Sequence, residues 1–282
     1  MPLLFRKVKD IRNHLQALRC DRGLNIGFVP TMGYLHKGHM ALIERSKIQN
    51  DVTVVSIYVN PTQFGPGEDY ERYPRDLSRD MAVCEELGVD VVFAPPDEEM
   101  YPVGFRTTVN VKGLGDFLEG KFRPGHFVGV ATVVLKLLNI VQPDRAYFGE
   151  KDYQQLKLVE SMVEDLLLPV EIVPVETVRE PDGLAYSSRN TYLSPSERES
   201  ALSIYRSFLL AQELIDKGER RAEFIKGEME RFILSHPHVR KIDYVEITDS
   251  DLNPKTKVEP GDRILVAVWV GNTRLIDNWK VK

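Results

Sequence analysis

The feature of the sequence that most constrains the fold is a near-continuous β-branched run from Val52 to Val59. A strand with one solvent-facing side would alternate apolar and polar residues, so this run predicts a strand that is buried on both faces. Strands of that kind occur mainly in parallel sheets that carry helices on both sides. The run therefore predicts an α/β core.

Similar short apolar runs recur on both sides of this segment and alternate with helical patterns as far as about residue 175. Further strands are expected at residues 26–30, 89–94, 145–148 and 170–175, and helices at residues 39–50 and 128–141. This order of elements predicts a Rossmann-like parallel sheet with helices on both faces. Ligands of such folds bind in the crevice beyond the carboxyl ends of the strands.

The pattern changes after about residue 175. Ser194 to Glu197 forms a capping box with proline at the first helical position, which predicts a long helix to about Lys217. A second helix is expected at residues 221–234, and strands at residues 241–247, 263–270 and 273–279. Gly271 and Asn272 are typical of a hairpin turn between the last two strands. We therefore predict two domains, residues 1–175 and 176–282, of which the second is a smaller α+β domain.

Composition argues against several classes of function. The 282 residues carry a formal net charge of −5, without the basic excess that is typical of nucleic-acid binding, although one small nucleotide could still bind. Cys20 and Cys84 lack the spacing of metal ligands, so we expect two free thiols and a cytoplasmic protein. No segment approaches about 18 consecutive apolar residues, so no membrane span is expected.

The segment PTMGYLHKGH, residues 30–39, follows an expected strand and leads into an expected helix. Gly33 and Gly38 allow the backbone to approach a ligand closely, and the N–H groups of a helix N-terminus favour phosphate. His36 and His39 are three residues apart and can point into one cleft, where imidazole N–H groups would stabilise charge on a phosphate. Two structural histidines are the alternative, whereas zinc is disfavoured because no third or fourth ligand is nearby. HxGH in this setting is typical of the nucleotidyltransferase superfamily that includes class I aminoacyl-tRNA synthetases.

Two other polar segments also follow expected strands. In NPTQFG, the amides of Asn60 and Gln63 suit hydroxyl and carboxylate groups, although Asn-Pro is also a common turn. In FGEKDYQQ, Lys151 is a candidate phosphate ligand, and Asp152 is a candidate ligand of a ribose hydroxyl or of magnesium-bound water. Gln155 lies one helical turn beyond Lys151, so both can face the same side. The alternative for this segment is an ordinary charged helix start.

Two loops add candidate groups. GLAYSSRN, residues 183–190, offers two hydroxyls and a guanidinium that could hold phosphates, or it is a solvated turn before Ser194. RPGHF, residues 123–127, is a polar, glycine-containing loop before a very apolar helix. Loops in such positions often carry function.

Together, PTMGYLHKGH, NPTQFG, RPGHF, FGEKDYQQ and SSRN resemble, in the same order, the motifs of the pantoate–β-alanine ligase (pantothenate synthetase) family. The resemblance covers essentially the whole chain. It implies that the N-terminal domain binds ATP and pantoate, that the C-terminal domain acts as a lid, and that the protein is a homodimer. It implies that ATP–Mg²⁺ and pantoate give pantoyl-adenylate and pyrophosphate, after which β-alanine attacks to give pantothenate and AMP. No organic prosthetic group is implied.

The resemblance also implies roles for individual residues. The catalytic residues would be His39, His36, Lys151, Ser187, Ser188 and Arg189. The ATP site would be lined by Met32, Gly33, Tyr34, Leu35, His36, Lys37, Gly38, His39, Gly149, Glu150, Lys151, Asp152, Val178, Tyr186, Ser187, Ser188 and Arg189. Gln63 would bind pantoate and β-alanine, Gln155 would bind pantoate, and Asn60 would support that end of the site.

The chain departs from the family pattern at Tyr186, which stands where methionine or leucine is usual before SSRN. Metal ligands cannot be assigned, because ATP oxygens and waters supply much of the magnesium shell. Asp80 is a candidate for a position near magnesium, and residues 65–67 are the candidate mobile loop.

Two other functions fit part of the pattern. The first is a nucleotidyltransferase that adenylates a phosphate, but NPTQFG and GEKDYQQ favour a pocket for a carboxylic acid. The second is a non-catalytic nucleotide sensor, but His39, Lys151 and Arg189 are all present.

Overall fold

The computed structural model describes the backbone of residues 1–282 and the side chains of residues 1–20 and 23–282. The chain forms two compact units. The first consists of residues 1–150 and 154–176, and the second of residues 151–153 and 177–282. Among the helices of the described residues, none combines the length and the apolar character needed to span a membrane.

The first unit is built on a parallel sheet of six strands in the order β1-β4-β3-β2-β5-β6. The strands are β1 (Leu3–Phe5), β2 (Ile26–Thr31), β3 (Val52–Ile57), β4 (Val91–Phe93), β5 (Arg145–Gly149) and β6 (Glu171–Val175). From β2 the chain runs to β3 and β4 on one side, and later to β5 and β6 on the other. The strand order therefore reverses beside β2, where α/β folds bind ligands.

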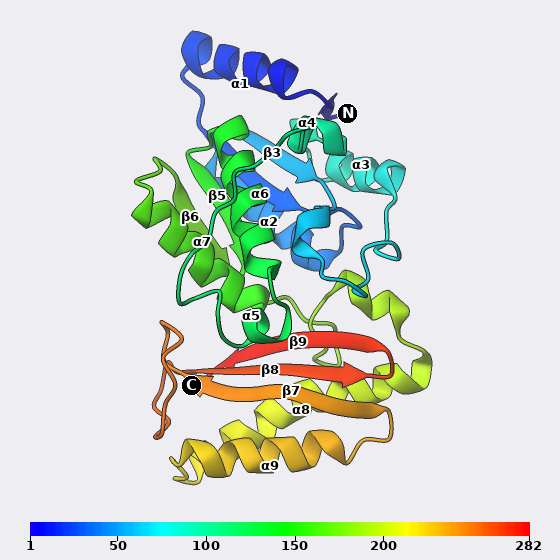
Figure 1. Ribbon diagram of the computed structural model, residues 1–282, viewed down its shortest axis with the longest axis vertical. Helices are drawn as coiled ribbons and strands as arrows, with labels where there is room; N and C mark the ends of the chain where they lie inside the picture. Colours follow the sequence, from blue (N-terminus) through cyan, green and yellow to red (C-terminus); the bar gives the residue numbers. More distant parts are fainter. The chain divides into compact units, whose positions relative to one another are not determined.

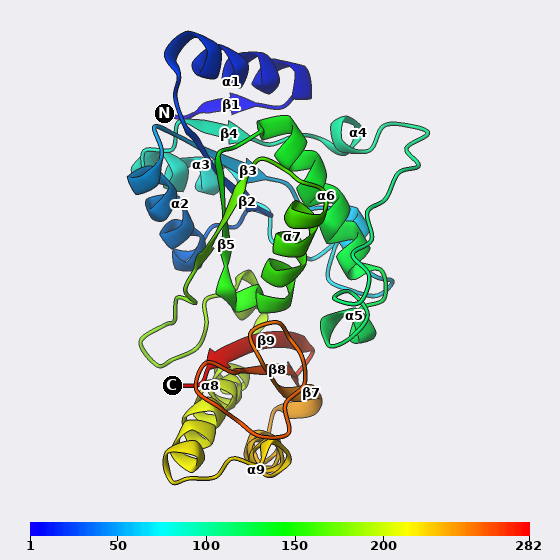
Figure 2. The same cartoon turned by 90° about the vertical axis from the view of Figure 1, so that its left-hand side faces the viewer.

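Helices cover both faces of this sheet. In the first unit, α2 (Lys37–Gln49) and α3 (Leu77–Glu86) lie on one face, and α6 (His126–Val141) and α7 (Tyr153–Asp165) on the other (Figures 1 and 2). Helix α1 (Val8–Arg22) packs against α6. The short helices α4 (Asp97–Met100) and α5 (Glu119–Phe122) interrupt the connection from β4 to α6.

Strand β3 is buried on both faces, as its composition predicts. Val55 packs with α2 and α3 in one apolar cluster, and its neighbour Val54, which points to the opposite face, is equally inaccessible. The predicted Rossmann-like parallel sheet is confirmed. Strand β1 and helices α1 and α3 were not predicted, because β1 has three residues and each helix buries only a narrow apolar stripe, such as Ile11 and Leu15 in α1.

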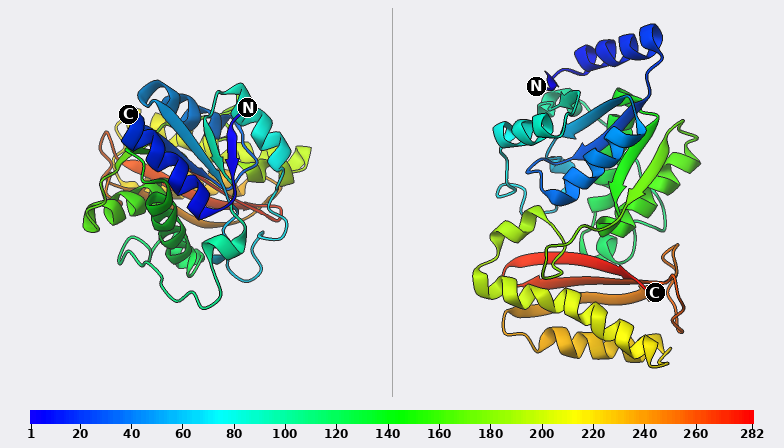
Figure 3. Two further views of the ribbon diagram at one scale, coloured as in Figure 1. Left: turned by 90° about the horizontal axis from the view of Figure 1, so that it is seen from above. Right: turned by 180° about the vertical axis from the view of Figure 1, so that it is seen from behind.

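The second unit is a three-stranded antiparallel sheet with two helices. Strands β7 (Val239–Thr248), β8 (Arg263–Val270) and β9 (Thr273–Lys280) are neighbours in that order. Helices α8 (Pro195–Asp216) and α9 (Ala222–Leu234) pack on one face of the sheet through an apolar core (Figures 1 and 3). The predicted capping box at Ser194 and the two-residue hairpin turn at Gly271 are both present. The predicted smaller α+β part is therefore confirmed.

Candidate active site

The turn between β2 and α2 is fixed by side chains from neighbouring strands and helices. Thr31, the last residue of β2, donates from its hydroxyl to the Ser56 carbonyl (2.7 Å) and accepts from the Gly33 N–H (3.0 Å). Gly33 has a φ of 79°, and a Cβ there would lie 2.8 Å from Asp80 Oδ2. Glycine is therefore required at this position by its backbone conformation and by the close approach of Asp80.

Asp80, on α3, holds the next part of the same turn. Its carboxylate accepts hydrogen bonds from the Tyr34 and Leu35 N–H groups, each at 2.7 Å, and it is 1% exposed. Burial raises the pKa of Asp80, while the two N–H donors and Arg79 oppose that shift. Arg79 also donates to the Leu35 carbonyl at 2.9 Å. The structure thus gives Asp80 a clear role in shaping the turn, which sequence reasoning missed.

His36 and His39 lie at the N-terminus of α2 with a defined orientation. His36 caps the helix and accepts on Nδ1 from the Gly38 N–H (3.2 Å), while His39 accepts on Nδ1 from the His36 N–H (3.3 Å). The ring centroids are 4.0 Å apart. A neutral imidazole that accepts on Nδ1 carries its proton on Nε2, so both rings are set as Nε2–H donors. Such donors at a helix N-terminus suit phosphate oxygens.

Gln63 lies in a turn, η1 (Pro61–Gln63), that follows β3. Asn60 is 1% exposed and donates from Nδ2 to Gln63 Oε1 (3.1 Å) and to the Gly129 carbonyl (3.2 Å). Its Oδ1 accepts from Thr62 and from the Tyr101 hydroxyl. Since both ends of the Asn60 amide have protein partners, the contacts indicate that Asn60 acts by orienting Gln63.

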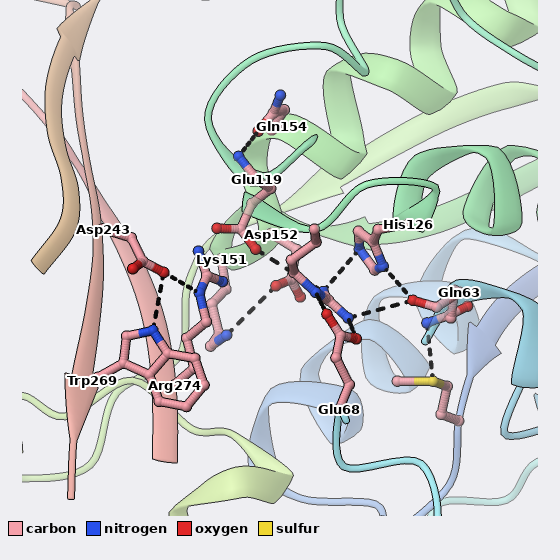
Figure 4. Close-up of polar contacts among 12 residues, drawn as sticks. Gln63, Glu68, Glu119, His126, Lys151, Asp152, Gln154, Asp243, Trp269 and Arg274 are labelled. Carbon is pink, nitrogen blue, oxygen red and sulfur yellow. Dashed lines mark hydrogen bonds and ion pairs between the residues drawn. The ribbon is translucent and has the colours of Figure 1, made fainter. Parts of the chain in front are cut away.

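The predicted ATP residue Met32 contacts the predicted acid-binding residue Gln63. Gln63 Nε2 lies 3.1 Å from Met32 Sδ (Figure 4). Met32 follows β2 and Gln63 follows β3, so the structure brings two predicted motifs together at the carboxyl edge of adjacent strands. This edge also carries Gly149, the last residue of β5.

A charged cluster fastens the loop after Gln63 to the segment RPGHF. Arg123 binds Glu68 through two hydrogen bonds, from Nε at 2.8 Å and from Nη2 at 2.6 Å (Figure 4). Arg123 Nη1 lies 3.0 Å from His126 Nε2, and His126 Nδ1 lies 2.8 Å from the Gln63 carbonyl. Since Arg123 can only donate, His126 accepts on Nε2 and donates from Nδ1 to Gln63. The side chain of His126 in RPGHF therefore supports Gln63 by binding the backbone carbonyl of Gln63.

The environment of His126 makes stability depend on pH. Burial, followed by the charge of Arg123, lowers the pKa of His126 from 6.5 to about 4. The unfolded chain therefore binds the His126 proton at a higher pH than the folded chain does. The contribution of neutral His126 to the free energy of unfolding is complete above about pH 6.5 and is lost as the pH falls towards 4. We expect a loss of about 3 kcal/mol over that window, measured by urea unfolding. His126→Gln should flatten the profile there. Burial opposes ionisation of the neighbouring Glu68, but Arg123 outweighs it and lowers the pKa of Glu68 below its ordinary value. An unchanged slope in the variant would contradict this assignment.

Helix α6 can approach the Gln63 turn only because position 129 is glycine. A Cβ on Gly129 would lie 2.4 Å from the Thr62 carbonyl oxygen and 2.6 Å from the Gln63 backbone nitrogen. We expect Gly129→Ala to destabilise the protein by about 1–3 kcal/mol through overpacking, and to displace Gln63. The matched control is Gly227→Ala in α9, where a Cβ meets nothing within 4 Å. Gly227→Ala should stabilise the fold by about 0.5–1 kcal/mol, and similar thermal midpoints for both variants would refute the packing argument.

The glutamines of FGEKDYQQ have different surroundings. Gln154 is 3% exposed, donates to the carbonyls of Leu114 and Phe117, and accepts from the Glu119 N–H (3.0 Å). Gln154 therefore holds the loop before α5. Gln155, the predicted pantoate ligand, is half-buried on α7, and its contact with the acid stays a prediction.

In the second unit, two of the predicted phosphate-binding segments share one pocket. Its lining includes Lys151 and Asp277 together with Ser187 and Asn190 of the SSRN segment. The Lys151 side chain is 19% exposed and pairs with Asp152 at 3.5 Å. The structure therefore places Lys151 beside the hydroxyl-rich loop although 35 residues of chain separate them in sequence, from 152 to 186.

The SSRN segment follows a short hairpin of residues 178–186. Val178, the predicted adenine contact, accepts from the Tyr186 N–H (3.1 Å), and Arg179 and Ala185 form an antiparallel bridge. Tyr186 thus closes the hairpin with its backbone, so its departure from the family pattern leaves this hydrogen bond unaffected. Ser187 caps the η3 turn (Ser188–Tyr192) by accepting from the Arg189 N–H.

Sequence reasoning singled out only Asp80, as a candidate near magnesium, among the residues that hold these segments in place. They are Asp80, Glu68, Arg179, Asp277 and Asn278. Their only signal in the sequence is that they are polar residues within otherwise apolar or turn segments. Nothing in the sequence names distant partners such as Leu35 for Asp80, 45 positions away, or Lys151 for Asn278, 127 positions away.

A parallel sheet with this strand order, and with paired histidines on the turn beside its switch point, defines a Rossmann-like nucleotide-binding protein with an added α+β unit. A family profile described as Pantoate-beta-alanine ligase matches residues 3–280. The pantothenate synthetase of Aquifex aeolicus (strain VF5) is 70% identical over 282 residues, which is 100% of both chains. The chain therefore belongs to the pantoate–β-alanine ligase family and is an enzyme of the ligase class.

Solved structures agree with this assignment. The pantothenate synthetase from Thermus thermophilus is 50% identical, with a TM-score of 0.93 and 99% of each chain covered. The pantoate–β-alanine ligase from Francisella tularensis, complexed with beta-gamma ATP and β-alanine, is 37% identical, with a TM-score of 0.82 and coverage of 99% of this chain and 98% of that one.

Proposed function

We propose that this enzyme joins pantoate to β-alanine at the expense of ATP, through a pantoyl-adenylate, and releases pyrophosphate and AMP. The observation that carries the proposal is the turn after β2, where two imidazoles at a helix N-terminus are both set as Nε2–H donors. Family membership supports the choice of acid and amine. The ligands of the Francisella tularensis relative support ATP and β-alanine as substrates.

In the first step, a pantoate oxygen attacks the α-phosphorus and pyrophosphate leaves. His39 and His36 donate to phosphate oxygens, where negative charge increases in the transition state. The positive end of the α2 dipole adds to this field. His36 and His39 need not exchange a proton with the substrate, because the carboxylate of pantoate is already a nucleophile.

Further phosphate contacts come from Lys151 and the SSRN segment. Lys151 supplies a positive charge, and Ser187, Ser188 and Arg189 supply hydroxyl and guanidinium donors. The ATP site would also include Gly149, Glu150 and Asp152, with Val178 at the adenine. Lys151 and Ser187 lie close enough together to line one small pocket, and this proximity supports their joint action on one polyanion.

In the second step, the amine of β-alanine attacks the acyl carbon of the adenylate and AMP leaves. Gln63 binds pantoate and lies near β-alanine, and Gln155 binds pantoate. The Gln63 amide has a fixed orientation, because Asn60 and Met32 each contact one of its ends. A fixed amide favours one pose of the acid, which supports attack at a single carbonyl.

Magnesium would enter with ATP. Among the side chains that the structure describes, no group of three or more His, Cys, Asp or Glu residues is arranged to hold a metal ion. The residues present fit magnesium that is held mainly by phosphate oxygens and water, with Asp152 as a protein ligand of that water. When bound, magnesium would neutralise phosphate charge.

The deciding experiment measures pyrophosphate and AMP release from ATP–Mg²⁺ and pantoate, with and without β-alanine. Pantoate-dependent pyrophosphate release, with AMP turning over only when β-alanine is present, would support the proposal. Absence of pantoate-dependent pyrophosphate would refute it, and a dinucleotide product would indicate adenylation of a phosphate instead.

We also propose the organisation that the family resemblance implies. Residues 1–175 would form the domain that binds ATP and pantoate, and residues 176–282 would act as a lid. The protein would be a cytoplasmic homodimer, which light scattering after gel filtration would check by a mass of twice that of one chain. The free thiols Cys20 and Cys84 fit a reducing compartment.

A further inference from the structure

Two consecutive residues of β9, Asp277 and Asn278, contact different segments of the second unit. Successive side chains of a strand point to opposite faces of the sheet. The carboxylate of Asp277 binds Arg179, and the amide of Asn278 binds the backbone of Lys151. Neither residue was predicted from the sequence to take part in the site.

Asp277 anchors the hairpin that precedes SSRN. Arg179 donates to both carboxylate oxygens of Asp277, at 2.6 and 3.0 Å, and the two side chains are 16% and 5% exposed. The same guanidinium donates to the carbonyls of Gly183 and Asn278, each at 3.1 Å. Arg179 therefore joins the start of the hairpin and its turn at Gly183 to β9. Because this pair is buried and uses two parallel hydrogen bonds, it fixes direction as well as distance.

The hairpin is also confined from its other side. Gly183 has a φ of 98°, and a Cβ there would lie 1.9 Å from the ring of Tyr205. Asn190, at the end of SSRN, donates to the Ala185 carbonyl (3.0 Å) and to Glu180 (3.1 Å). The hairpin and SSRN therefore move together, and the Arg179–Asp277 pair sets their position on β9.

Asn278 anchors the lysine. Its Nδ2 donates to the Lys151 carbonyl at 2.9 Å, and its Oδ1 accepts from Arg263 Nη1 at 3.1 Å. Arg263 also stacks over the ring of Tyr153, with its guanidinium carbon 4.2 Å from the centroid. The backbone at residues 151–153 is thus held to β8 and β9 from two sides.

We propose that Asp277 and Asn278 are positioning residues that set the distance between Lys151 and the SSRN loop, so that both meet one triphosphate. Asp277, Lys151 and Ser187 line one small, mostly apolar pocket, so the first of these anchors lies close to both groups that it positions. The inference rests on the proposed function, because it assigns Lys151 and the SSRN loop to the phosphates of ATP. It predicts that loosening either anchor impairs the adenylation step and spares the amide-forming step, in which the triphosphate has already been cleaved.

The test uses shape-conserving variants of the full-length enzyme. Asp277→Asn removes the charge opposite Arg179, and Asn278→Asp replaces the donor to the Lys151 carbonyl with an oxygen. Asp277→Glu is the conservative variant that retains the charge. The matched control is Glu246→Gln, which removes a carboxylate from an ion pair with Lys226 (3.1 Å) between β7 and α9 of the same unit.

Three measurements are made on each variant: pantoate-dependent pyrophosphate release, amide formation from supplied pantoyl-adenylate and β-alanine, and calorimetric affinity for MgATP. Asp277→Asn and Asn278→Asp should each lower kcat/KM for MgATP in the first reaction by about tenfold or more. In these two variants, amide formation should stay within about twofold of the wild type. Asp277→Glu should retain more of the kcat/KM for MgATP than Asp277→Asn does. The control Glu246→Gln should change none of the three measured quantities by more than about twofold.

Equal losses in both half-reactions, or variants that match Glu246→Gln, would overturn the proposal. If the wild type releases no pantoate-dependent pyrophosphate, the proposed function fails instead, and calorimetry then decides about the anchors. A MgATP affinity about tenfold lower in both variants than in the control would still support them, and an unchanged affinity would overturn them.

Discussion

His39→Asn is expected to lower the rate of pantoate-dependent pyrophosphate release by about 10²–10³, the loss that follows removal of one preorganised donor from a transition-state site. In the folded protein His39 accepts on Nδ1 from the His36 N–H, so under the proposed function its Nε2–H is the group that would donate to phosphate. The Asn amide reaches only as far as Nδ1. It can keep the helix cap and therefore the fold, but it has no atom where Nε2 stood.

His39→Gln tests the opposite half of the ring, because its terminal nitrogen reaches about as far as Nε2. We expect this variant to retain more activity than His39→Asn although it disturbs the cap that His36 and His39 form. Thermal melting should rank the two variants in the reverse order, since losing a cap acceptor costs about 1 kcal/mol. If His39→Asn kept wild-type adenylation, His39 would have only its capping role.

Much of the fold follows from local patterns, because the patterns that carry it are strong. The run at 52–59 has too few polar positions for a one-sided strand, and it became the central strand β3, Val52–Ile57. The capping box at Ser194 and the turn at Gly271 depend on residues within four positions of each other, so they could be predicted without a partner. Strand β1 is only three residues long, and its pairing with β4 depends on chain 88 positions away.

The candidate site divides in the same way. The residues proposed to contact substrate lie in short motifs, and the chemistry of His, Lys and amide groups at strand ends can be predicted from those motifs. Residues that orient them act over long separations in sequence. Asp80 reaches the Tyr34 N–H across 46 positions, and Asn278 reaches the Lys151 carbonyl across 127. A single sequence specifies such pairs only through the completed fold, which is why Asp80 suggested magnesium before its two N–H partners were known.

Lys151→Met is the other change with a large expected effect. The methionine side chain keeps most of the apolar stem of lysine, so packing at the 19%-exposed site should survive. What is lost is the positive charge beside Ser187 in the shared pocket. If this charge meets the phosphates, pantoate-dependent pyrophosphate release should fall by about 10²–10³, and amide formation from supplied pantoyl-adenylate should fall much less.

Lys151→Arg and Asp152→Asn separate the charge from its geometry. Arg keeps the charge on a larger, planar group, so it should recover only part of the rate.

Asp152→Asn removes the carboxylate that lies 3.5 Å from Lys151 Nζ. If Asp152 only neutralises the lysine, this variant should bind MgATP more tightly, because an opposing charge has gone. If Asp152 instead orders magnesium-bound water, binding should weaken and should recover at higher magnesium concentration. Equal activity of Lys151→Met and the wild type would remove Lys151 from the phosphate site and leave Ser187, Ser188 and Arg189 as the remaining candidates of this group.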